Sequence, residues 1–293
     1  MIRSLLFLPG NAPKMLEKGP FLGADTLIFD LEDAVSPDEK DAARILLKHT
    51  LSTTDFGNAR KVVRINSIDE NDFWKLDLEA LIPTRPYAVL LPKAENVEDV
   101  QKVSLYIQKL EEKNGIVPGA TGMILLLETC LAIEHAYDLA VADKRVCGLL
   151  LGAEDLTADM QAIRTLESNE IMYARMKVVT AARAAKIDAY DTPFTDMKEE
   201  EKFEQDVTKA RKFGFTGKAS INPRHVAEIN RLFLPTKKEI EYAHAVLDAI
   251  TEGKASGRGA VALNGKMIDR PVVLRAERII EAEKEFGGEL LNE

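Results

Sequence analysis

Two carboxylates follow successive apolar runs of this sequence, at a spacing that suits metal chemistry. Glu128 ends the run that begins at Gly122, and Asp155 comes just after the next run, Cys147 to Gly152. If these runs are neighbouring parallel strands, about 4.8 Å apart, the two side chains can share one cation. We expect Mg²⁺, because carboxylates gathered at one mouth repel and stay protonated unless a cation neutralises them. In the alternative interpretation they cap the following helices, for which Asp155 is a fair candidate.

A second acidic pair and an arginine also follow apolar runs. Glu32 and Asp33 come after Thr26 to Leu31. They could hold water molecules at a metal, or cap a helix whose first turn contains Pro37-Asp38-Glu39, and the residues leave both interpretations open. Arg64 ends a β-rich run, where an unpaired guanidinium is unfavourable. It therefore pairs with an acid or receives an anionic substrate, and we favour the second.

Eight short apolar runs alternate with longer segments of helical period, which is typical of βαβ units. Continuous hydrophobicity, as in Thr26 to Phe29, indicates burial on both faces of a parallel sheet. We therefore predict a closed (β/α)₈ barrel, in which functional side chains stand at the C-terminal ends of the strands. The runs are Ser4 to Pro9, Thr26 to Leu31, Lys61 to Asn66, Tyr87 to Pro92, Gly122 to Glu128, Cys147 to Gly152, Asp188 to Thr192 and Gly217 to Pro223.

The segments between the runs are predicted to be crossover helices. After the fourth run, Val100, Val103 and Ile107 repeat at three- and four-residue steps. Asn96 is placed to cap the start of this helix, and Gly115 follows its end.

Residues 1–235 hold the predicted barrel, and residues 236–293 form an appendage that a minimal barrel does not need. The appendage is predicted to contain a helix from about Lys237 to Ile250, a Gly-rich linker from Gly253 to Gly259, a short strand-like hairpin from Ala260 to Ile268 and an amphipathic final helix. We expect it to act as a lid or an oligomerisation arm.

Composition and charge exclude several classes of function. The 293 residues are 46% hydrophobic and 30% charged, which supplies enough apolar material for one large core. The net charge of −9 argues against nucleic acid or an anionic membrane as partner. No apolar run approaches the roughly 18 residues of a membrane span, and the apolar start of the chain is short for a signal peptide, so we expect a cytoplasmic protein.

The cysteines and histidines show no metal-binding spacing. Cys130 and Cys147 form no CxxC pair, so we expect two buried, reduced thiols. The histidines show no HExxH spacing, so any metal must be held by oxygen. The glycine spacing in Gly214 to Lys218 is too short for a phosphate-binding loop, which argues against a nucleotide-hydrolysing enzyme.

Taken together, the motifs resemble those of citrate lyase beta subunits, within the aldolase/citrate lyase family that includes malyl-CoA and citramalyl-CoA lyases. The resemblance runs nearly end to end. The matching motifs are Arg3 to Gly10, Phe29 to Asp33, Val63 to Asn66, Leu91 to Lys93, Glu128-Thr129, Leu151 to Leu156, Gly217 to Arg224 and Asn264 to Asp269.

The resemblance implies roles for the residues singled out above. It implies that Glu128 and Asp155 bind Mg²⁺, that Arg64 contacts the reacting acyl group, and that Glu32 and Asp33 support the metal's water molecules.

The resemblance also adds residues that spacing does not identify. It implies that Asp269 reaches a neighbouring subunit's site as acid or base, whereas the residues alone favour a helix N-cap before Arg270-Pro271. It places Lys14 near the CoA or phosphopantetheine arm. The chain would then form a homo-oligomer, a trimer or a hexamer.

The implied reaction is Mg²⁺-dependent cleavage of a citryl thioester to oxaloacetate and an acetyl thioester. Arg64 would stabilise the departing enolate, and Asp269 or a water would return a proton to carbon. The amides of Gly152, Ala153 and Glu154, at a helix start, suit the substrate carboxylate. The citryl group would be carried by an acyl carrier protein, in a complex with a transferase subunit. The alternatives are a stand-alone citramalyl-CoA or malyl-CoA lyase, and a catalytically silent scaffold subunit.

Overall fold

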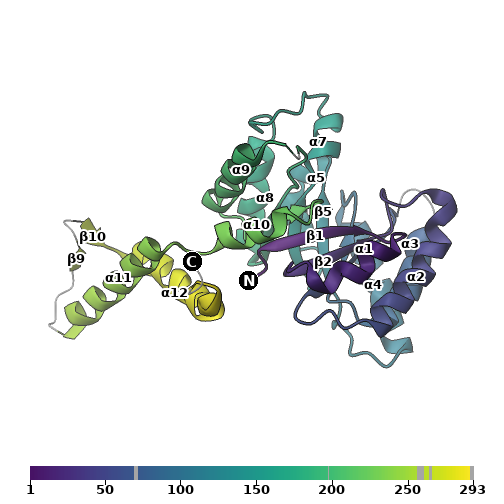
Figure 1. Ribbon diagram of the computed structural model, residues 1–293, viewed down its shortest axis with the longest axis horizontal. Helices are drawn as coiled ribbons and strands as arrows, with labels where there is room; N and C mark the ends of the chain where they lie inside the picture. The colour runs from purple at the N-terminus through teal and green to yellow at the C-terminus, as the bar shows by residue number, and fades with distance from the viewer. Residues whose placement is uncertain (69–71, 197, 256–260, 264–265, 291–293) are drawn as a thin grey trace. The chain divides into compact units, whose positions relative to one another are not determined.

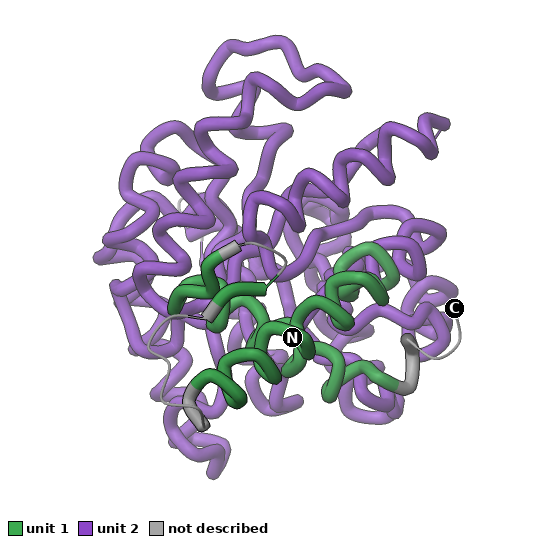
Figure 2. Tube along the Cα trace, turned by 90° about the vertical axis from the view of Figure 1, so that its left-hand side faces the viewer, with its two compact units in different colours: residues 1, 231–293 green, residues 2–230 purple. Residues whose placement is uncertain are grey.

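The structure, a computed structural model, consists of two compact units, Ile2–Asn230 and Met1 with Arg231–Glu293 (Figure 2). The residues that it describes are 1–68, 72–196, 198–255, 261–263 and 266–290.

The unit Ile2–Asn230 is a closed barrel of eight parallel strands that follow one another in chain order, with β8 pairing back onto β1. This confirms the predicted (β/α)₈ fold. Figure 1 shows strands β1, β2 and β5 of this barrel together with its helices. Each predicted run overlaps one strand: β3 and β6 begin one residue before their runs, and the strands end up to three residues before the runs do. They are β1 (Ser4–Pro9), β2 (Thr26–Asp30), β3 (Arg60–Arg64), β4 (Ala88–Leu91), β5 (Gly122–Leu127), β6 (Val146–Leu151), β7 (Asp188–Asp191) and β8 (Gly217–Ser220).

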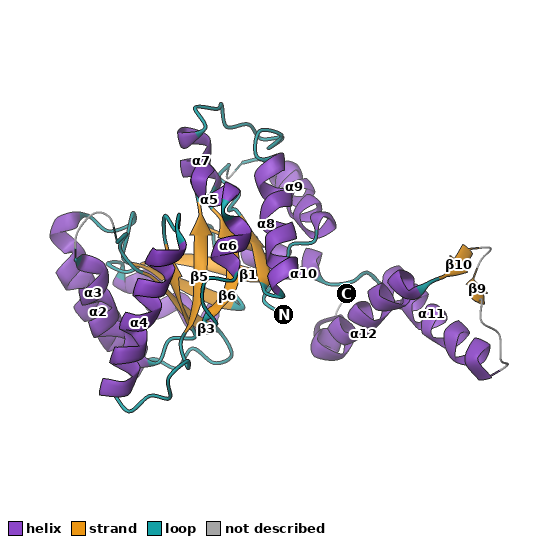
Figure 3. Ribbon diagram, turned by 180° about the vertical axis from the view of Figure 1, so that it is seen from behind, coloured by secondary structure: helices purple, strands orange, loops and turns teal. Residues whose placement is uncertain are grey.

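Helices connect the strands and cover the outside of the barrel (Figure 3). The predicted cap of α4 is confirmed, because the Asn96 side chain accepts a hydrogen bond of 2.9 Å from the Asp99 amide. The α-helices are α1 (Pro13–Lys18), α2 (Lys40–Thr53), α3 (Phe73–Leu81), α4 (Val97–Lys113), α5 (Cys130–Glu134), α6 (Ala136–Ala140), α7 (Ala153–Asp159), α8 (Met172–Ala185), α9 (Glu200–Phe213) and α10 (His225–Phe233). Short 3₁₀ turns are η1 (Gly19–Phe21), η2 (Pro37–Glu39) and η3 (Ile82–Thr84).

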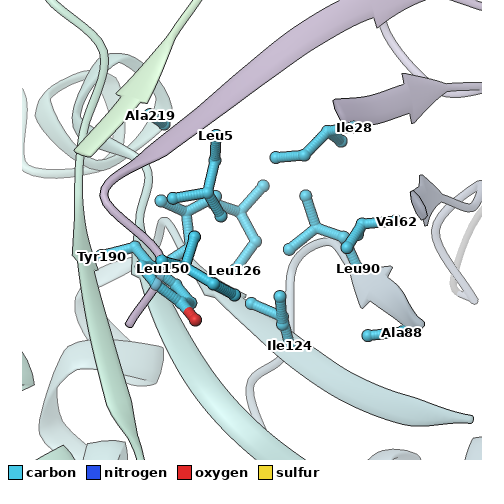
Figure 4. Packing of buried hydrophobic residues seen from close by; sticks show 11 residues of the cluster. Leu5, Ile28, Val62, Ala88, Leu90, Ile124, Leu126, Leu150, Tyr190 and Ala219 are labelled. Carbon is cyan, nitrogen blue, oxygen red and sulfur yellow. The ribbon is translucent and has the colours of Figure 1, made fainter. Parts of the chain in front are cut away.

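The barrel interior is filled by alternate residues of the strands, which pack into one apolar cluster (Figure 4). Burying each leucine or isoleucine contributes roughly 1.5–3 kcal/mol. The cluster contains Ile2, Leu5, Ile28, Val62, Ala88, Leu90, Ile124, Leu126, Leu150, Tyr190 and Ala219.

The same alternation sets which residues enter the mouth of the barrel. Successive side chains of a strand point to opposite faces, so the second residue after an inward one also points inward. Two residues beyond Ile28 stands Asp30, and two beyond Leu126 stands Glu128. Both line the cavity described below. The alternation that points apolar side chains into the barrel core therefore also points Asp30 and Glu128 into the cavity at the C-terminal ends of their strands.

The unit formed by Met1 and Arg231–Glu293 contains two long helices and a hairpin. Helix α11 spans Lys237–Ala255 and α12 spans Arg270–Leu290, and between them β9 (Val261–Leu263) pairs antiparallel with β10 (Lys266–Ile268). Helix α11 includes residues 253–255, which were predicted to belong to the Gly-rich linker. Residues 256–259 of that linker and residues 260 and 264–265 of the predicted hairpin lie outside the described residues. The unit's core is formed by Ala243, Val246, Ile268, Val273, Ala276 and Ile280.

The expectation of two buried thiols is wrong for one cysteine. Cys130 is exposed, because it is the first residue of the short helix α5 on the surface. Cys147, in β6, is partly buried and its thiol donates a hydrogen bond of 3.4 Å to the Met123 carbonyl. Among the described residues, no helix is long and apolar enough to cross a membrane.

Candidate functional site

A cavity of about 480 Å³ opens at the C-terminal ends of the barrel strands. Its floor is apolar and includes Phe7, Leu126 and Leu150. Charged side chains gather on its walls, as the barrel architecture predicts for a functional site. The polar lining residues are Asp30, Asp33, Arg64, Glu128, Glu154, Asp155, Thr192 and Thr195.

Arg64, the last residue of β3, is held by acidic residues of β2 and the loop that follows. Its Nε and Nη2 donate hydrogen bonds of 2.7 and 2.5 Å to the two carboxylate oxygens of Asp30. Its Nη1 lies 2.8 Å from Glu32 Oε2 and 3.3 Å from Asp33 Oδ2. Burial would lower the pKa of Arg64, but the bonds and charge of Asp30 raise it above its usual value. The structure therefore shows the pairing with acids. Arg64 also lines the cavity, and its contact with an anionic substrate stays a prediction.

Lys40 and Asp30 hold the backbone of the loop that follows β2. The Lys40 ammonium donates hydrogen bonds of 2.8 and 2.7 Å to the carbonyls of Leu31 and Glu32. The Asp30 carboxylate accepts from the amides of Glu32 and Ala34 at 2.8 and 3.3 Å. The backbone that carries Glu32 is therefore held rigidly beside the cavity.

Glu32 is buried yet incompletely satisfied. Within the described part of the chain, neither of its carboxylate oxygens takes part in a hydrogen bond of acceptable geometry. The contacts with Arg64 Nη1 and with Lys93 Nζ, at 2.8 and 3.6 Å, are thus contacts of charge. Burial raises the pKa of Glu32 to about 7, against the charge of Arg64. The following helical turn begins at Pro37 with Ser36 before it, so neither Glu32 nor Asp33 is its cap.

Glu128 and Asp155 lie beside one another, as the sequence predicts. Glu128 is 3% exposed, and its Oε1 accepts a hydrogen bond of 2.8 Å from the Lys93 amide. Burial raises the pKa of Glu128 to about 8, and the neighbouring Glu32 and Asp155 carboxylates add to the effect. Asp155 stands exposed in the first turn of α7.

These residues fit a magnesium ion. No group of three or more His, Cys, Asp or Glu side chains suited to a metal occurs among the described residues, but Mg²⁺ is commonly held by one or two carboxylates with water. A Cβ on Gly152 would lie 2.7 Å from Glu128 Cβ and 2.9 Å from its Oε2, so glycine keeps that carboxylate's space open. The unbonded Glu32 oxygens nearby are further acceptors.

Lys93 is a site residue that the sequence analysis missed. It has a left-handed φ of 48°, which is unfavourable by about 1–2 kcal/mol for a residue with a side chain. This conformation accompanies the bond from its amide to Glu128. Such strain is typical of functional sites.

The predicted anion-binding amides already have partners at two of three positions. The Gly152 amide donates to the Leu127 carbonyl at 3.0 Å, and the Ala153 amide donates to Thr192 Oγ1 at 3.1 Å. The Glu154 side chain is exposed and pairs with Arg164 Nε at 3.1 Å. All three predicted residues nevertheless line the cavity.

Two residues implied by the family resemblance are not among the residues that line this cavity. Lys14 is an exposed residue of α1, whose neighbour Met15 lines the cavity. Asp269 belongs to the other unit, where its Oδ1 accepts a hydrogen bond of 3.2 Å from the Val272 amide at the start of α12. That is the capping that the residues alone favour. The role of Asp269 at a neighbouring subunit's site stays a prediction.

Known proteins resemble the chain along nearly its whole length. It is 41% identical over 279 residues to the citrate lyase subunit beta of Leuconostoc mesenteroides subsp. cremoris, covering 95% of this chain and 92% of that relative. It is 32% identical over 287 residues to the mitochondrial citramalyl-CoA lyase of Mus musculus, covering 95% and 85%.

A solved structure has the same fold. The protein CitE of Mycobacterium tuberculosis, in complex with magnesium, acetoacetate and coenzyme A, matches with a TM-score of 0.79 at 29% identity, covering 96% of this chain and 98% of that one. Residues 3–223, nearly the whole barrel, match the model of one family. The chain thus belongs to the HpcH/HpaI aldolase/citrate lyase family.

Proposed function

We propose that this carbon–carbon lyase uses Mg²⁺ to cleave a citryl thioester to oxaloacetate and an acetyl thioester. The observation that carries the proposal is one cavity in which the buried Glu128, the adjacent Asp155 and the Arg64 guanidinium meet. The similarity to a citrate lyase subunit beta, and to a protein crystallised with magnesium and coenzyme A, supports it.

Glu128 and Asp155 would hold the Mg²⁺, which when bound polarises the carboxylate and hydroxyl oxygens of the oxaloacetate half. The hydroxyl gives its proton to a water molecule of the site as its oxygen becomes the keto oxygen of oxaloacetate. The bond between the hydroxyl-bearing carbon and the thioester's α-carbon breaks, and its electron pair passes to the thioester as an enolate. Arg64 stabilises this charge, and since Asp30 already fixes the guanidinium, little reorganisation is needed.

The remaining groups control water and protons. The apolar floor of Phe7, Leu126 and Leu150 keeps bulk water from the breaking bond. Glu32 and Asp33 orient the water molecules of the site. The α-carbon receives its proton from Asp269 of a neighbouring subunit or from a water, which completes the acetyl thioester.

We further propose that the substrate is carried by an acyl carrier protein, in a cytoplasmic complex that includes a transferase subunit. Lys14, exposed on α1, would contact the phosphopantetheine or CoA arm. The subunit would act as a homo-oligomer whose Arg231–Glu293 unit serves as lid or arm. A stand-alone citramalyl-CoA lyase is the second candidate, favoured by the 32% identical relative with that name.

One panel of assays tests the substrate. Purified protein with Mg²⁺ is given citryl, citramalyl and malyl thioesters, each on CoA and on a carrier protein, and oxaloacetate, pyruvate and glyoxylate are measured. We expect the highest kcat/KM for a citryl thioester. A preference for citramalyl-CoA would move the assignment to the second candidate, and cleavage of none of the six would contradict the lyase.

A further inference from the structure

Helix α7, which carries Asp155, begins without a cap of its own. Its N-cap residue is Gly152, which has no side chain with which to accept a hydrogen bond from the first amides of the helix. A larger residue is excluded there, because its Cβ would lie 2.7 Å from Glu128 Cβ. Because Glu128 occupies the space beside Gly152, none of the usual capping residues, such as serine or aspartate, can stand at this N-cap position.

A residue of the neighbouring strand region supplies the missing acceptor. Thr192, directly after β7, accepts a hydrogen bond of 3.1 Å from the Ala153 amide through its Oγ1. Thr192 is 1% exposed and lines the same cavity as Glu128 and Asp155. Because Ala153 is the first residue of α7, this bond ties the start of the helix to the barrel wall.

Thr192 is itself held by a buried lysine. Lys218, in β8, is fully buried and its ammonium donates a hydrogen bond of 2.6 Å to the Thr192 carbonyl. The same ammonium lies 2.7 Å from Asp191 Oδ2 and 2.7 Å from Asp206 Oδ2. The carbonyl and the hydroxyl of Thr192 are thus engaged from two different elements.

Arg175 completes the buried group beneath Thr192. Its Nε and Nη2 donate to the two Asp191 oxygens at 2.9 and 2.8 Å, and Nη2 also donates to Asp206 Oδ1 at 2.7 Å. The two positive charges of Arg175 and Lys218 are balanced by the two negative charges of Asp191 and Asp206. These ion pairs connect β7, β8, α8 and α9. Buried ion pairs of this kind seldom add net stability, but they can fix one geometry.

We propose that Thr192 is a positioning residue for the metal site: its hydroxyl caps α7 from β7 and so sets Asp155 against Glu128, with Lys218 holding Thr192 in place. The inference rests on the proposed function for its metal and adds two residues, Thr192 and Lys218, that touch neither metal nor substrate in that proposal. It also accounts for a fully buried lysine on the outer face of the barrel wall.

The test compares Thr192→Val, which keeps the volume but removes the hydroxyl, with Thr192→Ser, which keeps the hydroxyl. Mn²⁺, a spectroscopic substitute for Mg²⁺, is titrated into metal-free protein by calorimetry and electron paramagnetic resonance. Loss of a residue that orients a ligand typically weakens metal binding 10- to 100-fold, so we expect the Kd of Thr192→Val to rise roughly 10-fold. Thr192→Ser should stay within about twofold of wild type.

Thr26→Val is the matched control. Thr26 begins β2 at the far end of the barrel, is fully buried, and its hydroxyl has no hydrogen-bond partner within the described residues. The same isosteric change there should leave the Mn²⁺ Kd at the wild-type value. If the valine methyl at Thr192 prevents folding, Thr192→Ala removes the same hydroxyl without adding volume.

A second readout needs no metal. Deuterium uptake by peptides covering residues 152–160 should be faster in metal-free Thr192→Val than in wild type or Thr192→Ser, because the Ala153 amide has lost its acceptor. Wild-type uptake together with wild-type Mn²⁺ affinity in Thr192→Val would overturn the positioning role and leave the metal assignment standing. Wild-type protein that binds no Mn²⁺ would overturn both.

Discussion

At the scale of single residues, Arg64 is fixed before any substrate arrives. Two hydrogen bonds to Asp30 hold its plane, and its third nitrogen faces Glu32 and Asp33. This fork-to-fork pairing uses geometry that a lysine cannot reproduce. The position of the positive charge in the cavity therefore depends on the shape of the guanidinium as well as on its sign.

We predict that Arg64→Lys lowers kcat by roughly 100- to 1,000-fold, as loss of a preorganised charge-stabilising donor does in other enzymes. Steady-state kinetics with a citryl thioester gives the measurement. Arg60→Lys is the control, because Arg60 stands at the opposite end of the same strand, 4.5 Å over the Tyr87 ring. Equal kcat values for the two variants would show that Arg64 supplies only a diffuse positive charge.

The raised carboxyl pKa values of Glu128, about 8, and Glu32, about 7, predict how the metal-free protein responds to pH. Metal binding must displace the proton of Glu128, so Mn²⁺ affinity should rise with pH and level off above about 8. In the unfolded chain these groups ionise near their ordinary value of 4.5, so their contribution to stability is present at low pH and is lost as pH rises toward 8.

Calorimetric titrations and denaturant unfolding between pH 5 and pH 9 measure both trends. Glu128→Gln, which cannot ionise, should reduce the loss of stability between pH 5 and pH 8. A metal-free protein whose free energy of unfolding is unchanged over that interval would contradict the buried, protonated state of Glu128.

At the scale of elements, the strands could be predicted because burial on both faces leaves continuous apolar runs, as in β2 and β5. Counting in steps of two from Ile28 would also have found Asp30 as an inward residue, a signal that the sequence analysis did not use. The left-handed turn at Lys93 could not be predicted, since it depends on Glu128, which is 35 residues away. The capping of α7 by Thr192 could not be predicted for the same reason, because the two bonded residues are 39 positions apart in the sequence.

Element packing gives a prediction for Gly152→Ala. The added Cβ would lie within 3 Å of Glu128, and either the carboxylate or the start of α7 must move. We expect the fold to persist and the Mn²⁺ Kd to rise at least about 10-fold, a loss typical of disturbed ligand orientation. Gly287→Ala, at a helical glycine with nothing within 4 Å, is the control and should leave the Kd unchanged. Wild-type affinity in Gly152→Ala would show that Glu128 is not a ligand.

At the scale of the whole molecule, the chain divides after Asn230, and the acid proposed for catalysis, Asp269, belongs to the second unit. There it caps α12. Asparagine is an equally good cap, so Asp269→Asn removes the charge while keeping the helix start. The Asp269→Asn variant can therefore test the proposed shared site without destabilising the start of α12.

We predict that Asp269→Asn and Glu128→Gln homo-oligomers are each nearly inactive, and that dissociating and reassembling them together restores activity. Mixed oligomers would contain some sites with both native groups. Subunit exchange is verified by mass spectrometry of labelled chains. Exchange without recovery would show that Asp269 serves its own subunit or has only its capping role.

The most direct test of the central claim is product formation by metal-stripped protein given a citryl thioester. Wild type should form no oxaloacetate until Mg²⁺ is added, and then oxaloacetate and acetyl thioester in equal amounts. Glu128→Gln and Asp155→Asn, folded by circular dichroism, should stay at least about 100-fold slower at the same Mg²⁺ concentration. Cleavage by the stripped wild type, or near wild-type rates in either variant, would contradict the account.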